Sequence, residues 1–432
     1  MKQKAEEIFL SGVQSVLPDQ LICNNLNINN NILFIGVKKF NLSDFENVYV
    51  LGMGKASALM AKEMENVLGE LITDGHVVTK YGHGTELKRI SITEAGHPIP
   101  DANGIAGTQK ILEIARSATK HDIVICLISG GASALLADFP SGASLDDLKR
   151  TNELLVASGA NIHEINTVRK HLSYVKGGQL AKGMYPATVI GLILSDVVGD
   201  SLDVIASGPT VADTSTFADA KLVIDKYKLL LPAPIAQYIE NGLNGSVPET
   251  PKTKDTIFER VYNFLIGSNR IALNAASKKA KELGFEPYIV TDALQGDVLD
   301  VAQYILQSIK KFKQTGKPLC LLFGGEPTIN VLGNGVGGRN QHLALYLATQ
   351  VAGQENIVIL CAGTDGTDGP TDAAGAVIDG KTLSSALVNN IHPEKYLSNS
   401  DSFHFFQQVG GHIVTGNTGT NVMDMIVVLV NN

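Results

Sequence analysis

The chain has 432 residues, of which 44% are hydrophobic and 18% charged, with 35 Lys and Arg against 43 Asp and Glu. This length predicts two or three domains with sizeable cores, and the composition excludes a disordered chain. A formal net charge of −8, without any run of Lys or Arg, argues against nucleic-acid binding. The sequence lacks an apolar run of bilayer-spanning length and a secretion signal, so we expect a soluble, cytoplasmic protein.

Strand-like apolar runs alternate with helix-period segments, which is typical of an α/β fold with largely parallel sheets. In the first half, strands are predicted at Val48–Leu51, His76–Thr79, Ile90–Thr93, Ile123–Ile128 and Thr188–Leu194, and helices at Ala56–Leu68 and Ile105–Arg116. Ligands of open α/β sheets bind at the carboxyl ends of the strands. The polar loops that follow these strands are therefore the candidate sites.

The alternation of strand-like and helix-like segments weakens between the two halves of the chain. The segment Leu231–Thr256 is polar and contains four prolines, so it is predicted to be a linker. We expect a Rossmann-like α/β domain over residues 1–250 and a second α/β domain over residues 251–432. In the second domain, strands are predicted at Tyr262–Ile266, Glu286–Val290, Pro318–Phe323, Ile329–Leu332, Ile357–Ala362 and Val422–Val430, with helices at Arg270–Leu283, Val298–Lys313 and Asn340–Ala352.

Two glycine-rich motifs of the first half follow predicted strands. The first, Gly52-Met53-Gly54-Lys55-Ala56-Ser57, has neither P-loop spacing nor the third glycine of a dinucleotide-binding motif. Lys55, at a helix start, would suit a phosphate or carboxylate, although a surface lysine beside a tight turn is the alternative. The second motif, Ser129-Gly130-Gly131-Ala132-Ser133, is predicted to cradle a phosphate, with tight helix–sheet packing as the alternative.

Acidic residues mark two further strand ends. Asp196 and Asp200 follow the strand Thr188–Leu194, where they would share a cation or where one would act as a base, and Asp196 is preferred. The run Thr364-Asp365-Gly366-Thr367-Asp368 follows the strand Ile357–Ala362 and would hold a divalent ion together with substrate phosphates, or present ordered hydroxyls to a sugar-like ligand. A solvated turn is the alternative.

The motif of the second half with the most glycine comprises Gly324-Gly325-Glu326 and, after a short interval, Gly337-Gly338-Arg339. An arginine at a helix start can hold a carboxylate or a phosphate through two parallel hydrogen bonds. So many glycines are difficult to explain by packing alone. We therefore expect this motif to bind an anion.

Together the five motifs, LGMGKAS, ISGGASALL, LSDVVGD with ASGPT, FGGEPT with GGRNQ, and AGTDGTDGPTD, resemble those of the glycerate 2-kinases of the MOFRL type. The resemblance extends from about Phe45 to the C-terminus. It implies two α/β domains with the active site in the interdomain cleft. It also implies Mg²⁺-dependent transfer of the γ-phosphate of ATP to the 2-hydroxyl of D-glycerate, giving 2-phosphoglycerate and ADP. His342 stands where that family usually has Glu.

The resemblance and the motifs together predict the site residues. Lys55, Arg339 and Asp196 are the predicted catalytic residues, and one or more of Asp196, Asp365 and Asp368 would hold Mg²⁺. The residues predicted to bind ATP are Gly52, Gly54, Ser129, Gly130, Gly131, Ala132, Ser133, Gly324, Gly325, Glu326, Gly337 and Gly338. The expected partners are small molecules, without nucleic acid or membrane, and a homodimer is compatible with the sequence. Two alternatives stay open: an NAD(P)-dependent hydroxypyruvate reductase and a non-catalytic protein that binds a nucleotide or a sugar phosphate.

Overall fold

The computed structural model describes residues 1–312 and 317–431, which form two compact units. Unit 1 comprises Met1–Gln20, Asp196–Gly199 and Gly267–Asn432, and unit 2 comprises Leu21–Ser195 and Asp200–Ile266. These ranges differ from the predicted domains, 1–250 and 251–432, for two physical reasons. Helix α1 (Lys2–Ser15) buries one face in the core of unit 1, and strand β9 (Val261–Gly267) extends the large sheet of unit 2.

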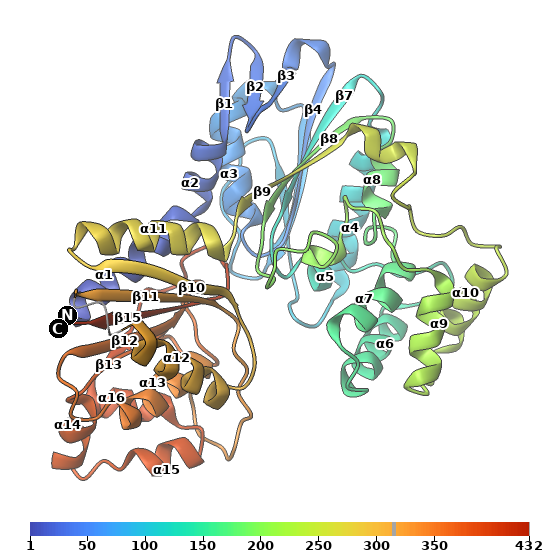
Figure 1. The fold of residues 1–432 in the computed structure, drawn as a ribbon. Coiled ribbons are helices and arrows are strands. Elements are labelled where there is room, and N and C mark those ends of the chain that lie inside the picture. Colours follow the sequence, from blue (N-terminus) through green and yellow to red (C-terminus); the bar gives the residue numbers. More distant parts are fainter. Residues whose placement is uncertain (313–316, 432) are drawn as a thin grey trace. The chain divides into compact units, whose positions relative to one another are not determined.

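The large sheet of unit 2 has the strand order β6-β5-β4-β7-β8-β9. Its strands β4, β7, β8 and β9 are labelled in Figure 1. Its first five strands pair in parallel, as the sequence predicts. Their bounds are β4 (Asn47–Met53), β5 (Asp74–Lys80), β6 (Ser91–Ala95), β7 (Asp122–Ile128) and β8 (Thr188–Leu194). Every residue of β7 and β8 is buried, which explains their continuous apolar sequences. Because β4 and β7 are neighbours, the two glycine-rich loops that follow them lie side by side.

Helices cover this sheet and form a separate cluster. Helix α2 (Pro18–Asn25) begins in unit 1 and ends in unit 2. The described helices that lie wholly in unit 2 are α3 (Ser57–Leu68), α4 (Ala102–Ser117), α5 (Ala132–Leu135), α6 (Leu145–Ala157), α7 (Ile162–His171), α8 (Gln179–Met184), α9 (Phe217–Lys226) and α10 (Ala233–Leu243). The predicted linker Leu231–Thr256 is wrong, since α10 lies inside it and buries Ile235 and Ile239 in the helical cluster. Proline is favoured in the first turn of a helix, so Pro232 and Pro234 mark a helix start here.

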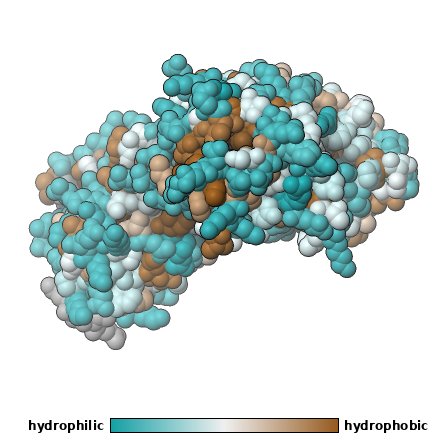
Figure 2. All heavy atoms as spheres, turned by 90° about the horizontal axis from the view of Figure 1, so that it is seen from above, coloured by the Kyte–Doolittle hydropathy of each residue, from teal (hydrophilic) through white to brown (hydrophobic). Residues whose placement is uncertain are grey.

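A small antiparallel sheet, absent from the sequence-based prediction, completes unit 2. It consists of β1 (Leu26–Asn29), β2 (Ile32–Ile35) and β3 (Lys38–Asn41). Short single-turn helices occupy Leu42–Asp44, Gly69–Leu71, Ile205–Ser207 and Thr256–Arg260. In the view of Figure 2 most of the surface is hydrophilic, and hydrophobic residues are visible in several separate areas.

The sheet of unit 1 has the order β10-β11-β15-β12-β13-β14. Its strands are β10 (Glu286–Leu294), β11 (Leu319–Gly325), β12 (Ile357–Gly363), β13 (Gly375–Asp379), β14 (His412–Ile413) and β15 (Asp424–Val430). The prediction of a largely parallel sheet is wrong here, because β15 enters between β11 and β12 and runs antiparallel to both. Among the strands that the structure describes in this sheet, β10 and β11 form the one parallel pair. The predicted strand Ile329–Leu332 is also wrong, since those residues form a loop.

Helices pack on both faces of this sheet. The helices of unit 1 are α1, α11 (Asn269–Glu282), α12 (Val298–Phe312), α13 (Arg339–Gln350), α14 (Thr382–Val388), α15 (Pro393–Ser398) and α16 (Ser402–Val409). Helices α1 and α11 share one core cluster with alternate residues of β11, and α12 and α13 share the other. Lys313, the last residue of a predicted helix, lies outside the described residues. Within the described ranges, no helix has the length and apolar character needed to cross a membrane.

Candidate active site

The two glycine-rich loops of unit 2 are bonded to each other. The amide of Lys55 donates to the carbonyl of Gly130 (2.9 Å), and the amide of Ala56 donates to the Ser129 hydroxyl (3.1 Å). Gly54 has φ of +114°, and a Cβ at this position would lie 2.3 Å from Ser129 Oγ. Glycine is therefore required here for close contact between the loops. Gly52 likewise packs against Val77, where a Cβ would lie 2.5 Å from a methyl group.

Lys55 extends along the second loop, beside His97. A Cβ on Gly131 would lie 3.2 Å from Lys55 Cγ and 3.1 Å from His97 Cδ2, so these three residues meet at one point. Burial, together with the charges of Lys55, Lys80 and His83, lowers the pKa of His97 to about 4. His97 is thus neutral at pH 7. Lys55 has no ion-pair partner within the described part of the chain, so its charge is available to an anionic ligand.

Polar groups continue from this point along the Ser129–Ser133 loop. The amides of Gly131, Ala132 and Ser133 donate to no group that the structure describes, which leaves three adjacent N–H donors. The Ser133 hydroxyl lies 2.8 Å from that of Ser207, which in turn donates to Asn166 Oδ1 (3.2 Å). Such a run of amides can bind an anion. The predicted helix start is nevertheless only the four-residue α5.

Arg339, the predicted anion-binding residue of unit 1, is held by two acids of its own unit. Its Nε and Nη2 donate to the two carboxylate oxygens of Asp424 (2.6 and 3.0 Å), and Nη1 donates to Glu326 (3.0 Å). Burial alone would lower the pKa of Arg339, but the bonds and charge of Asp424 raise it. Because a guanidinium has five N–H groups, two remain for a ligand. Glu326 therefore contacts Arg339, although it was predicted to line the ATP site.

The structure gives Asp368, a predicted metal ligand, a different set of contacts. Its Oδ1 accepts from the amide of Asn340 (3.0 Å) and its Oδ2 from the amide of Gln341 (2.8 Å), both in the first turn of α13. Burial raises the pKa of Asp368 to about 6 despite these bonds. The side chain thus anchors the start of the helix that carries Arg339.

Asp365 and Asp424 both lie close to Gly363. A Cβ on Gly363 would lie 3.3 Å from Asp365 Oδ1 and 3.4 Å from Asp424 Oδ1. Asp365 Oδ1 also accepts from the amide of Thr367 (3.0 Å). Among the described residues, no three His, Cys, Asp or Glu side chains are grouped so that they could hold a metal. The structure therefore does not gather Asp196, Asp365 and Asp368 into one three-acid site. Asp196 lies half-buried just after β8.

Close packing explains the glycines of the motif around Arg339, contrary to the expectation from the sequence. A Cβ would lie 1.6 Å from Asn269 Oδ1 at Gly324 and 2.2 Å from the Leu294 carbonyl at Gly325. At Gly337 it would lie 2.3 Å from Ser402 Oγ, and at Gly338 it would lie 2.3 Å from the Asp368 carboxylate. These glycines let neighbouring chain segments approach and so fix Arg339. An ATP contact is not needed to explain them.

Two residues of this site, Asp424 and His97, belong to no motif and are not among the predicted site residues. Asp424 is the first residue of β15 and is only 1% exposed. The sequence offers one signal for Asp424, an acid at the start of an otherwise apolar strand. His97 follows β6 in a loop that has no glycine-rich pattern before it.

Two family models match the chain: a domain of unknown function, DUF4147, over residues 4–240 and the MOFRL family over residues 319–424. A glycerate 2-kinase from Pyrococcus horikoshii is 43% identical over 426 residues, which cover 97% of this chain and 95% of that one. A D-glycerate 2-kinase from Thermotoga maritima is 41% identical over 435 residues, with coverages of 100% and 98%.

The comparison with solved structures agrees with these matches. The crystal structure of a glycerate kinase from Thermotoga maritima has a TM-score of 0.87 and 40% identity, and the similarity covers 99% of each chain. A relative from Agrobacterium vitis, 40% identical over 387 residues, carries another name, "Putative hydroxypyruvate reductase". That match covers 88% of this chain and 98% of the relative.

Two α/β units, each presenting a cation at a glycine-rich turn, define a phosphotransferase of the two-unit α/β class. The matched regions and the full-length relatives make the assignment more specific. The chain belongs to the MOFRL-type glycerate 2-kinase family.

Proposed function

We propose that this chain transfers the γ-phosphoryl group of ATP to the 2-hydroxyl of D-glycerate, with 2-phosphoglycerate and ADP as products. Support for the substrate comes from the relatives that are named glycerate 2-kinases, which match nearly the whole chain. The observation that carries the chemistry is the position of Lys55, an unpaired cation beside neutral His97 and three amide donors. Phosphoryl transfer depends mainly on positioning and on neutralising charge, and these groups supply both.

Each unit contributes one cation to this proposal. In unit 2, Lys55 and the amides of Gly131–Ser133 bind phosphate oxygens and stabilise the negative charge on the transferred group. In unit 1, Asp424 holds the Arg339 guanidinium in one orientation, so that its two remaining N–H groups face a carboxylate or phosphate oxygen together. That Lys55 and Arg339 serve the same substrate molecules stays a prediction.

The acids take two proposed roles. Asp196 accepts the proton of the glycerate 2-hydroxyl as the oxygen attacks the γ-phosphorus. Asp365 holds Mg²⁺, because the second oxygen of its carboxylate accepts no bond that the structure describes, whereas both oxygens of Asp368 bind the start of α13. Mg²⁺ commonly takes one or two carboxylates and completes its shell with phosphates and water, so a three-acid cluster is not required. When bound, the ion would neutralise charge on the phosphates of ATP.

The residues favour this reaction over the two alternatives. A reductase would need a dinucleotide site, but Gly54 is in contact with Ser129 and the strand after it ends at Lys80, without an acid for the ribose. A binding protein without catalysis would not need two separately oriented cations. We further propose that the chain acts in the cytoplasm on these small molecules, without nucleic acid, and that it forms a homodimer. Light scattering of the purified chain would give twice the mass of one chain if it does.

The test is an assay of the purified chain with three substrate sets. ADP release that needs both D-glycerate and Mg²⁺ supports the proposal. Oxidation of NADH by hydroxypyruvate in the absence of ATP would support the reductase instead. Binding of ATP without turnover under any condition would support the binding protein. A preparation of Lys55→Met, tested in parallel, controls for a contaminating kinase.

A further inference from the structure

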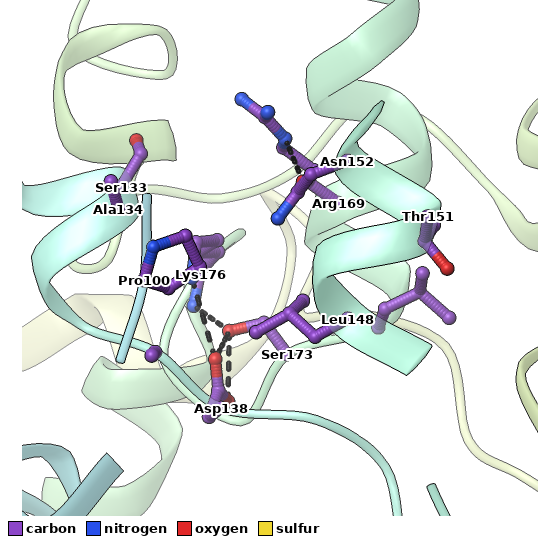
Figure 3. Close-up of a pocket in the computed structure, with 12 residues that line it drawn as sticks. Pro100, Ser133, Ala134, Asp138, Leu148, Thr151, Asn152, Arg169, Ser173 and Lys176 are labelled. Carbon is purple, nitrogen blue, oxygen red and sulfur yellow. Dashed lines mark hydrogen bonds and ion pairs between the residues drawn. The ribbon is translucent and has the colours of Figure 1, made fainter. Parts of the chain in front are cut away.

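A cavity of about 510 Å³ opens on unit 2 next to the glycine-rich loops. Its walls come from the loop after β6, the start of α5, and helices α6 and α7, and they include Ile99, Ser133, Val156 and Arg169. Figure 3 shows a smaller neighbouring pocket, which shares Arg169 and Ser133 with the cavity. The roles proposed above use one edge of this cavity, at Gly131 and Ser133, and leave Ile99, Val156 and Arg169 without a role.

One wall of the cavity is apolar although it faces solvent. Ile99 is 68% exposed and Val156 is 65% exposed, and Pro98, Pro100 and Ala134 lie on the same lining. Binding pockets for small molecules are typically lined in this way, with a few polar groups to fix the orientation of the ligand. A flat, largely apolar group would cover these side chains. D-glycerate, with three carbons that all bear oxygen, would not.

The polar side of the cavity carries a cation with no acid beside it. Arg169 Nε donates to Asn152 Oδ1 (2.8 Å), and the guanidinium forms an ion pair with no carboxylate among the described residues. Burial lowers the pKa of this guanidinium. Four of its five N–H groups therefore lack a protein acceptor, in a position where water is partly excluded. The one acid of the lining, Glu153, is paired with Arg150 (3.3 Å).

The acid of the neighbouring pocket is also engaged. Asp138 accepts from the buried ammonium of Lys176 (3.3 Å) and from the Ser173 hydroxyl (2.7 Å), and Figure 3 shows this group separate from the Arg169–Asn152 bond. Asp138 is thus neutralised by Lys176. The charge of Arg169 is left for a ligand.

We infer that the cavity binds the nucleoside and inner phosphates of ATP. The base lies against Ile99 and Val156, and Arg169 donates to phosphate oxygens. The Gly131–Ser133 amides adjoin the same cavity and continue the phosphate path toward Lys55. The inference rests on the proposed function for the choice of nucleotide, and it adds the residues that hold the part of ATP far from the reacting phosphate. Arg169 is a binding residue in this scheme.

The experiment measures ADP and adenosine binding by calorimetry for the full chain and two variants. Val156→Glu places a carboxylate on the apolar wall at an exposed helix position, so we expect both ligands to bind at least about tenfold more weakly. Arg169→Gln removes the phosphate contact, so ADP binding should weaken about tenfold or more while adenosine binding changes less than about twofold. Leu222→Glu, at another exposed apolar position, and Arg116→Gln, at an exposed position of α4 away from the cavity, are the matched controls and should leave ADP binding unchanged.

The outcomes separate this inference from the proposed function. Unchanged ADP binding in folded Val156→Glu overturns the inference. In steady-state kinetics of the same variant, a rise in the KM of D-glycerate with no rise in the KM of ATP would overturn it as well. If the wild-type chain binds ADP with the expected variant effects but forms no product from glycerate, the cavity is supported and the proposed reaction is not. Should Arg169→Gln fail to fold, Val156→Glu still decides the matter.

Discussion

Arg339 and Asp424 form a two-bond ion pair in which the carboxylate is buried and the guanidinium is 32% exposed. The pair joins the start of α13 to the start of β15, and Glu326 binds the third nitrogen. Arg339 therefore has one fixed orientation before any ligand arrives. Asp424 is a positioning residue, and Arg339 is the group proposed to touch the substrate.

The pair gives the first prediction. Arg339→Met should lower kcat by roughly 10²–10³, the effect of losing one electrostatic donor, and Arg339→Lys should restore little because a point charge lacks the two-bond fork. Asp424→Asn should lower kcat by about ten- to hundredfold, as for other supporting residues, with the KM of ATP unchanged. Steady-state kinetics on folded variants measure this. A wild-type kcat for Arg339→Met would contradict the role of Arg339.

Lys55 gives the second prediction. Lys55→Met should lower kcat by roughly 10²–10³ with little change in the free energy of unfolding, because Lys55 makes no ion pair with any residue that the structure describes. Lys62→Met, at an exposed position of the adjacent helix α3, is the control and should keep wild-type kinetics. Equal kcat values in the two variants would show that the charge of Lys55 is not used in the reaction.

The third prediction concerns the packing of Gly324. Gly324→Ala would bring a methyl group 1.6 Å from Asn269 Oδ1, so the free energy of unfolding should fall by about 1–3 kcal/mol. Gly183, inside α8, has open space around its α-carbon, and Gly183→Ala should raise the free energy of unfolding by up to about 1 kcal/mol. Denaturant titrations of both variants test the contrast. A Gly324→Ala chain of undiminished stability would mean that this glycine is not required for packing.

His76 gives a pH-dependent prediction. Its ring is fully buried between the hydroxyls of Ser91 and Thr93, and burial, followed by the charge of Lys110, lowers its pKa to about 4 from 6.5. Between these two pH values the unfolded chain takes up a proton that the folded chain does not. The free energy of unfolding should therefore fall by about 3 kcal/mol from this group as the pH decreases from 6.5 to 4.

The measurement compares wild type with His76→Gln, which keeps a hydrogen-bonding side chain but does not titrate. The variant should lose less stability over the same pH range. Asp368, whose pKa is raised to about 6, acts in the opposite direction, but it is present in both proteins and cancels in the difference. Parallel pH curves for the two proteins would refute the assignment.

The acids of the Thr364–Asp368 run give the last variant pair. Asp365→Asn should raise the Mg²⁺ concentration needed for half-maximal activity about tenfold or more, because it removes a proposed metal ligand. Asp368→Asn should lower the free energy of unfolding by about 1 kcal/mol through weaker anchoring of α13, with the Mg²⁺ requirement unchanged. The reverse pattern would assign the metal to Asp368.

The sequence predicted the parts of the fold that are fixed by local pattern. Strands β4, β7 and β8 are apolar because both faces of their sheet are covered, and Lys55 follows the first of them. The pairing of strands that are distant in the sequence could not be predicted from local patterns. The last strand, β15, lies between β11 and β12, and this crossing of the sequence order makes the sheet mixed and brings Asp424 to Arg339.

Two patterns in the sequence, the glycines near Arg339 and the prolines at the start of α10, each have more than one physical explanation. The binding of ATP by the glycines at 324, 325, 337 and 338 stays a prediction, because close contact between chain segments leaves the same sequence pattern and also accounts for them. Pro232 and Pro234 looked like linker residues because proline marks helix starts as well as loops. Ile235 is buried because it packs in one cluster with residues of α9. No local sequence pattern predicts that these two helices meet.

The most direct measurement of the central claim is the identity of the phosphorylated product. The chain is incubated with D-glycerate and Mg·ATP, and enolase alone is then added to convert 2-phosphoglycerate to phosphoenolpyruvate. We predict phosphoenolpyruvate in an amount equal to the ADP formed. Phosphoenolpyruvate that arises only after phosphoglycerate mutase is also added would show transfer to the 3-hydroxyl and contradict the account.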